Sequence, residues 1–217
     1  MQNAHRLFLV TVPTMASSTG ALRMFARARL GADWKPAGPA EQVDVGSRGI
    51  AWGEAFHDWA AEGEPRKIEG DHRTPAGIYN VGRPFGFEPS SLKGYLQLQA
   101  DSVCVEDPAS PAYNTITSGK TIGHARALEN MRMTPLYRRG LIVEYPTDRE
   151  TKAGSCIFLH IWKGPAKGTA GCVTMPEERV AVLQKFADEH PTVVAVIPET
   201  ALARLNSCLS SVEATAH

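Results

Sequence analysis

Residues 154–176, GSCIFLHIWKGPAKGTAGCVTMP, combine a strand, a loop and a helix start around one histidine and one cysteine. The run Cys156–Ile161 is rich in β-branched and aromatic residues and predicts a β-strand. The Gly and Pro residues that follow it predict a loop. Pro176, followed by two glutamates, favours the first turn of a helix. His160 is therefore expected on the strand, and Cys172 between the loop and the helix.

This arrangement suits a cysteine nucleophile. A thiolate is the reactive form, and the His160 imidazole could take the proton from the Cys172 thiol. The helix start could further stabilise the anion, and the amides of Gly171 and Cys172 could form an oxyanion hole. The alternative is structural, because a single cysteine is usually a small buried apolar residue. A histidine at a strand end, likewise, usually has a local partner.

The rest of the chain predicts a β-rich α+β fold in one domain over residues 5–206. Its length of 217 residues and hydrophobic content of 43% are sufficient for one substantial core. Strands are expected, from β-branched and alternating residues, at Leu7–Val12, Gln42–Val45, Gly77–Val81, Tyr95–Gln99, Leu141–Glu144, Cys156–Ile161 and Val193–Ile197. Helices are expected at Ala21–Leu30, Ile122–Met133 and Pro176–His190. Residues 207–217 are small and polar and are expected to be a frayed tail.

The charge distribution gives no reason to expect a nucleic-acid partner. Lys and Arg total 23, Asp and Glu also total 23, and the formal net charge is zero. No apolar run approaches the roughly 20 residues that cross a bilayer. The apolar stretch within His5–Pro13 is interrupted by Thr11, and it is interpreted as a first strand rather than as an export signal.

The four cysteines do not form a disulfide scaffold, and no pair has the C-x-x-C spacing of a zinc or redox motif. If Cys172 is a free nucleophile, the other three can form at most one bridge. Cys156 lies in an apolar run and is expected in the core. Cys104 and Cys208 have no supporting chemistry nearby, so a surface thiol or an incidental bridge is expected for both.

Two motifs in this sequence resemble the L,D-transpeptidase catalytic domain, also called the YkuD-type domain. Thr169–Cys172 matches the family's Ser/Thr-x-Gly-Cys motif, and His160 matches its upstream histidine. The segment Gly70–Tyr79, GDHRTPAGIY, resembles the family's Gly-Asp-x-Arg-Thr-Pro-x-Gly segment. Weaker similarities extend the resemblance over roughly residues 5 to 200; they lie at residues 46–53, 107–110 and 113–114. The resemblance implies a YkuD-type β-sandwich with inserted helices and a catalytic cysteine loop.

The sequence also departs from the commonest form of that family. Ala170 replaces the histidine that usually precedes the Gly-Cys pair, and Thr174 replaces the usual Arg or Asn. The twelve positions from His160 to Cys172 are fewer than usual. This pattern resembles a divergent subgroup thought to join diaminopimelate to an L-Ala-linked donor position. The resemblance therefore predicts the class of reaction better than it predicts which bond the protein forms.

The resemblance implies a peptidoglycan L,D-transpeptidase that needs no cofactor or metal and acts on stem peptides in the periplasm or cell envelope. Cys172 would attack a peptide carbonyl, His160 would move the proton and a carbonyl at Ile161 could orient the imidazole. Further substrate contacts are expected from Thr169, Ala170, Arg73, Trp162 and Tyr137. Arg73 could instead only hold its turn together, and Trp162 could pack in the core. Residues 126–138 could form a lid or a solvated helix face.

Other functions remain open at this level. An L,D-carboxypeptidase would resolve the thioester with water, and a peptidoglycan amidase or antibacterial toxin could use the same scaffold. A binding module that has lost catalysis would not need the intact histidine and cysteine. A generic cysteine protease would not need the Gly70–Tyr79 segment. The sequence does not predict the oligomeric state.

Overall fold

A computed structural model describes residues 3–123 and 126–206 of the chain, and the expected tail at 207–217 lies outside this part. Most of the strands in the described chain belong to one 11-stranded sheet. Its main path runs through β1 (Arg6–Val12), β14 (Thr192–Pro198), β6 (Thr74–Gly86), β11 (Arg139–Glu144), β12 (Phe158–Ile161), β13 (Val173–Met175), β4 (Glu41–Asp44), β2 (Thr19–Ala26) and β3 (Lys35–Pro36). Two short strands, β5 (Ile50–Trp52) and β7 (Leu96–Gln97), pair with β6.

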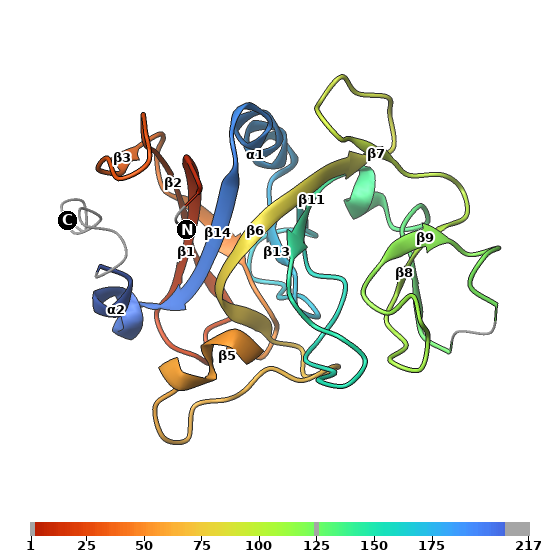
Figure 1. The fold of residues 1–217 in the computed structure, drawn as a ribbon, viewed down its shortest axis with the longest axis horizontal. Helices are drawn as coiled ribbons and strands as arrows, with labels where there is room; N and C mark the ends of the chain where they lie inside the picture. The colour runs from red at the N-terminus through yellow and green to blue at the C-terminus, as the bar shows by residue number, and fades with distance from the viewer. Residues whose placement is uncertain (1–2, 124–125, 207–217) are drawn as a thin grey trace.

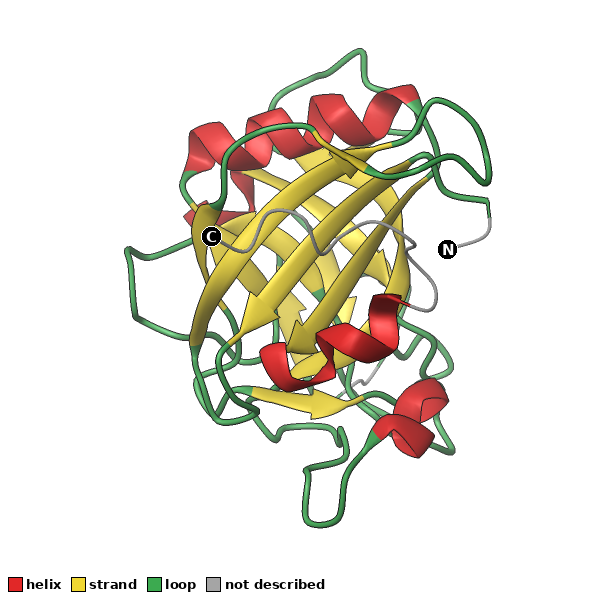
Figure 2. Ribbon diagram, turned by 90° about the vertical axis from the view of Figure 1, so that its left-hand side faces the viewer, coloured by secondary structure: helices red, strands yellow, loops and turns green. Residues whose placement is uncertain are grey.

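The main sheet closes on itself. β2 pairs with β4 on one side and antiparallel to β1 on the other, which returns the path to its first strand. Figure 2 shows the resulting strand barrel, with the strands wrapped around a common interior. The prediction of a β-rich fold with few helices is confirmed. The expected two-sheet sandwich is replaced by a barrel because the β1–β2 pairing removes the free edges that a sandwich would retain.

A second sheet of three short strands lies beside the barrel (Figure 1). It consists of β10 (Leu128–Asn130), β8 (Ser102–Val105) and β9 (Ile116–Ser118), in that order. All four residues of β8 are buried, which is expected for the central strand of a sheet that also packs on the barrel. This small sheet forms one side of the pocket described below.

The longest helix, α1 (Glu177–Glu189), lies across one end of the barrel (Figure 2). Val180 and Leu183 are buried in the core and Phe186 packs against it, so the helix predicted from Pro176 is confirmed. The other helical turns are short: η1 (Glu54–Trp59), η2 (Pro135–Arg138), η3 (Glu199–Ala201) and α2 (Leu202–Asn206). No helix in the described ranges is long and apolar enough to cross a membrane.

Two helix predictions are wrong. The segment predicted as helix Ala21–Leu30 forms most of β2, because pairing with β1 and β4 outweighs the helix propensity of its Ala, Leu, Arg and Met residues. Within the predicted helix Ile122–Met133, Leu128–Asn130 forms β10 by pairing with β8. The other described residues of that segment form turns, and residues 124–125 lie outside the described part.

The predicted strands are present, with shifted limits. The strand expected at Gly77–Val81 is the middle of the 13-residue β6. The strand expected at Cys156–Ile161 begins at Phe158, and the one expected at Tyr95–Gln99 is reduced to β7.

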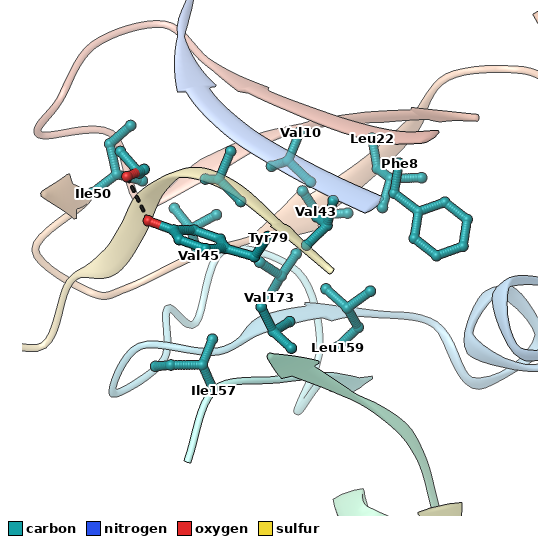
Figure 3. Packing of buried hydrophobic residues seen from close by; sticks show 14 of the residues in the cluster. Phe8, Val10, Leu22, Val43, Val45, Ile50, Tyr79, Ile157, Leu159 and Val173 are labelled. Atoms are coloured by element: carbon teal, nitrogen blue, oxygen red, sulfur yellow. Dashed lines mark hydrogen bonds between the residues drawn. The ribbon is translucent and has the colours of Figure 1, made fainter. Parts of the chain in front are cut away.

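The interior of the barrel is the largest apolar cluster. In Figure 3, Val43, Ile157, Leu159 and Val173 are drawn in this cluster, which brings β12 and β13 into the core.

Candidate active site

A pocket of about 920 Å³ lies between the small sheet and the loops around β12 and β13. Its lining contains most of the site residues expected from the sequence: Cys172, His160, Gly171, Thr169, Ala170, Trp162 and Tyr137. Arg73 does not line it. One guanidinium nitrogen of Arg73 instead donates to the carbonyls of Met15 and Ile50, at 3.3 and 3.2 Å. These contacts attach the segment of Arg73 to two other parts of the chain, and its expected contact with substrate stays a prediction.

The strand register explains why His160 and Cys172 share the pocket. Side chains alternate along β12, so Leu159 enters the barrel core while Phe158 and His160 point to the opposite face. β13 pairs in parallel with β12, with Leu159 opposite Val173 and His160 opposite Thr174. Cys172, one residue before Val173, therefore comes beside Phe158 on the face that carries His160.

The Cys172 thiol is held by backbone groups. Its side chain is almost completely buried, with 8% of the residue exposed. The Phe158 amide donates a hydrogen bond to Sγ at 3.3 Å, and Sγ in turn donates to the carbonyl of Cys156 at 3.4 Å. Burial raises the pKa of the Cys172 thiol well above its ordinary value, and the negative charge of Glu129 raises it further. The Phe158 amide only partly offsets this rise, so burial favours the neutral thiol form of Cys172.

His160 is also buried, and its orientation is fixed by the next residue. Its Nδ1 lies 2.9 Å from the carbonyl of Ile161, the contact that the family resemblance implies. Because a carbonyl can only accept, Nδ1 carries the proton of the neutral ring and Nε2 is left as the basic nitrogen. Burial lowers the pKa of His160 to about 4, partly offset by the carbonyls of Ile161 and Leu136. The Tyr137 ring packs edge-on to the imidazole, with 4.7 Å between ring centroids.

The expected contribution of a helix start to the thiolate is wrong. Strand β13 separates Cys172 from α1, and four extended residues span roughly 13 Å. A helix dipole acts only within about one turn of the helix end. Pro176 does begin the helix, as predicted, but the hydrogen-bond donor next to Sγ is the Phe158 amide.

The loop before Cys172 is held by hydroxyl and carboxylate side chains. The Thr169 hydroxyl donates to the Cys172 carbonyl at 2.7 Å and accepts from the Gly171 amide at 3.0 Å. The Gly171 amide is therefore already engaged, which leaves the Cys172 amide as the candidate oxyanion donor. The buried carboxylate of Asp44 accepts the amides of residues 166, 167 and 168, at 2.9, 2.8 and 3.3 Å. Asp44 was not predicted as a site residue.

The Gly70–Tyr79 segment contacts the main chain of Cys172. The Thr74 hydroxyl accepts from the Gly46 amide at 2.8 Å and donates to the Cys172 carbonyl at 3.3 Å. Asp71 forms an ion pair with the buried Lys67 at 2.7 Å. The turn of this segment is therefore attached to the main chain of Cys172. This contact gives the Gly70–Tyr79 motif a structural role beside Cys172.

Three glutamates, Glu69, Glu106 and Glu129, line the pocket and are called the acidic wall below. The Tyr137 hydroxyl donates to Glu129 at 2.5 Å, and the Ser155 hydroxyl donates to Glu69 at 2.7 Å. Burial, together with the charges of Glu129 and Glu69, raises the pKa of Glu106 to about 7. The sequence analysis did not predict these glutamates as site residues, and Glu129 falls in the segment 126–138 that was expected to form a lid or a solvated helix face. Tyr137, expected to contact substrate, is mostly buried between His160 and this wall.

Cys104 and Cys156 form a disulfide across 52 residues of sequence. Cys156 is in the core, as expected. Of the two expectations for Cys104, the bridge is found rather than the surface thiol, because β8 is buried against the barrel. Cys172 is a free thiol, and Cys208 lies outside the described residues. In the part of the chain that the structure describes, no group of three or more His, Cys, Asp and Glu is arranged to hold a metal ion.

The chain belongs to the L,D-transpeptidase catalytic domain family (YkuD), whose family model matches residues 38–196. No curated protein sequence matches it. Among solved structures, two of the helical cell shape determining protein Pgp2 from Campylobacter jejuni are similar, one of them a mutant. Both are 15% identical with a TM-score of 0.48, and the alignments cover 89% of this chain. The chain spans about half of Pgp2, 48% and 47% in the two structures.

Proposed function

We propose that the protein is a peptidoglycan L,D-transpeptidase that forms a thioester between Cys172 and a stem peptide. The supporting observation is that a free thiol and a neutral imidazole line one pocket in a domain of this family. Peptidoglycan is the substrate that the family implies. The pocket volume of about 920 Å³ lies within the range of roughly 300–1,000 Å³ typical of small-ligand sites.

The proposed first step is acylation of the thiol. Because both groups are neutral at rest, His160 takes the thiol proton on Nε2 as Cys172 Sγ attacks the peptide carbonyl. The Cys172 amide donates to the oxyanion of the tetrahedral intermediate, and one such donor is typically worth about 3 kcal/mol. The intermediate then breaks its C–N bond, and the leaving amine takes the proton from His160. A thioester remains on Cys172.

The second step transfers the acyl group to an acceptor. The amine of a second stem peptide attacks the thioester carbonyl, gives its proton to His160 and releases the Cys172 thiol with a new amide bond. The acceptor arrives mostly as an ammonium ion, which the negative charge of Glu129 attracts, and it loses one proton to solvent before the neutral amine attacks. We propose the bond joining diaminopimelate to an L-Ala-linked donor, because Ala170 and Thr174 match that subgroup. The proposed location is the periplasm or the cell envelope.

The alternative outcome is hydrolysis. If water resolves the thioester, the same chemistry gives an L,D-carboxypeptidase that shortens stem peptides. A peptidoglycan amidase or antibacterial toxin on this scaffold would instead cut a different bond. The exposed position of Ala170 on the pocket rim, where the commonest family members have a histidine, is compatible with either.

Identifying the products that the protein forms from peptidoglycan tests this proposal. The purified protein would be incubated with sacculi, and the muropeptides released by a muramidase would be separated and identified by mass spectrometry. Cross-linked dimers that are absent with the Cys172→Ala variant are the expected result. Shortened monomers without dimers would replace the transpeptidase with a carboxypeptidase. Unchanged muropeptides with the native protein would contradict both.

A further inference from the structure

The Cys104–Cys156 disulfide joins the two structures that surround the nucleophile. Cys104 is in the middle of β8, the central strand of the small sheet. Cys156 lies two residues before Phe158, the first residue of β12. The two Cα atoms are 6.1 Å apart, although the residues are 52 positions apart in sequence. The disulfide therefore connects the wall of the pocket to the strand that carries His160.

On one side, the disulfide holds the backbone that contacts Cys172. The Cys156 carbonyl accepts from the Cys172 thiol, and the Phe158 amide, two residues later, donates to the same sulfur. Cys156 itself has a φ of +56°, in the left-handed region that residues with a Cβ rarely adopt. Its amide donates to the side-chain oxygen of Asn114 at 2.9 Å. This uncommon backbone conformation is therefore held by two partners, Asn114 and the disulfide.

On the other side, the disulfide holds the strand that pairs with Glu129, one residue of the acidic wall. Cys104 is paired directly with Glu129 in the antiparallel register of β8 and β10. Glu129 accepts the hydroxyl hydrogen of Tyr137, whose ring packs on His160. Cys104, Cys156, Cys172 and Tyr137 all belong to one buried apolar cluster. The disulfide is thus linked to the Cys172 sulfur through the contacts of Cys156. It is linked to the His160 imidazole through the contacts of Glu129 and Tyr137.

We propose that the Cys104–Cys156 disulfide positions Cys172, so that the protein is active only while this disulfide is oxidised. The proposal rests on the proposed function in that Cys172 is taken as the nucleophile. Reduction by a dithiol breaks the S–S bond by thiol–disulfide exchange, leaves thiols on Cys104 and Cys156, and converts the dithiol to its own disulfide. The Cys156 carbonyl and the Phe158 amide are then free to leave the sulfur, and the wall is free to separate from the barrel. The protein would be inactive in a reducing compartment and would become active after export.

The test compares two folded proteins that differ only in this disulfide. Both carry Cys208→Ser, and one also carries Cys104→Ser and Cys156→Ser. Alkylation of Cys172 by iodoacetamide is followed by mass spectrometry of its peptide, and muropeptide products are measured in parallel. A third protein, Cys208→Ser with Val103→Ala, is the control, because Val103 is a buried residue of β8 next to Cys104. It weakens the small sheet but keeps the disulfide.

Loss of the disulfide is expected to expose the sulfur and to raise the alkylation rate at least about tenfold, because thiol reactivity follows thiolate fraction and access. Product formation falls by at least a similar factor, and the Val103→Ala control keeps both rates within about twofold. Equal alkylation rates in the two folded proteins would overturn the proposal, as would an equal increase in the control. Alkylation needs no peptidoglycan, so it decides the positioning role even if no cross-linked product forms.

A second measurement applies if the serine variant does not fold. The Cys208→Ser protein is reduced with dithiothreitol, checked for folded structure by circular dichroism, and alkylated at Cys172 before and after reoxidation. Faster alkylation after reduction, reversed by reoxidation, supports the proposal. Loss of folded structure on reduction would overturn it, because the disulfide would then stabilise the whole domain rather than position Cys172.

Discussion

The main-chain amide of Phe158 donates a hydrogen bond to the Sγ of Cys172 at 3.3 Å. This contact fixes the nucleophile against the strand that carries His160, because Phe158 and His160 point to the same face of β12. It also stabilises the anionic sulfur, while burial and Glu129 act in the opposite direction and prevail. Burial therefore favours the neutral forms of Cys172 and His160, and in the proposed mechanism a base removes the thiol proton during attack.

The Glu129→Gln variant tests the electrostatic control of the thiol. Glutamine can still accept the Tyr137 hydroxyl, so the substitution removes the charge that raises the pKa of Cys172 and keeps the hydrogen bond. We expect alkylation of Cys172 by iodoacetamide to become several-fold faster at pH 8 to 9, as the thiolate fraction rises. Tyr137→Phe is the matched control, because it removes the hydrogen bond and keeps the charge. A pH–rate profile identical to that of the native protein would exclude Glu129 as a cause.

His160→Gln should change both reactivity and pH-dependent stability. Without the imidazole, alkylation of Cys172 near neutral pH is expected to slow markedly. The pKa of His160 is about 4 in the folded protein, below its ordinary value of 6.5, so between these values the unfolded chain binds more protons. This contribution to stability is complete above pH 6.5 and is lost as the pH falls towards 4. The free energy of unfolding, measured with urea at pH 4.5 and at pH 7, should therefore differ less between the two pH values for the variant than for the native protein. An unchanged difference would mean that His160 does not titrate in this range.

Thr169 tests the conformation of the nucleophile loop. Thr169→Val removes the hydroxyl that joins the Gly171 amide to the Cys172 carbonyl, and it leaves both groups without this partner. We expect kcat to fall by roughly 10- to 100-fold, because small displacements of a nucleophile are costly. Thr169→Ser retains the hydroxyl and should keep activity within about threefold of the native rate. Equal losses in the two variants would show that the methyl group, not the hydroxyl, is important.

Asp44 tests how firmly the loop is attached to the barrel. Its carboxylate is 1% exposed and accepts three loop amides, so Asp44→Ala leaves these donors without their acceptor. We expect the free energy of unfolding to fall by at least about 3 kcal/mol, because a hydrogen bond to a charged group contributes roughly 1.5–3 kcal/mol and water replaces part of the loss at these part-buried amides. Asp148→Ala is the control, since Asp148 also accepts amides but is exposed in a distant turn. Similar losses in a urea titration of both variants would contradict a special role for Asp44.

The sequence predicted that Cys172 and His160 lie near each other, and both line the pocket, because local signals place them; their catalytic roles stay a prediction. An apolar run ending at His160, a glycine-rich loop and a Gly-Cys pair are contiguous, and strand pairing preserves their order. The helix beginning after Pro176 was predicted for the same reason. The predicted helix Ala21–Leu30 failed because its residues have helix propensity, whereas the neighbouring strands β1 and β4 decide its structure.

The rest of the site depends on contacts between distant segments. Asp44 lies between Val43 and Val45 in a run of buried residues. An acidic residue in such a run needs polar partners, and this was the one local signal for the role of Asp44. Glu106 and Glu129 are separated from Cys172 by more than forty residues, and only the small sheet brings them to the pocket. The partner of Cys156 could not be chosen from sequence either, because a pairing over 52 residues depends on the packing of β8.

Intact-mass spectrometry of the protein mixed with a stem tetrapeptide tests the central claim most directly. We expect a covalent acyl adduct on Cys172, labile to hydroxylamine as a thioester is, and absent from the Cys172→Ala variant. The variant should keep a melting temperature close to that of the native protein, because the substitution removes a single sulfur atom from a side chain of similar size. Product formation by Cys172→Ala at the native rate, or an adduct that persists on another residue of this variant, would contradict the assignment of Cys172 as the nucleophile.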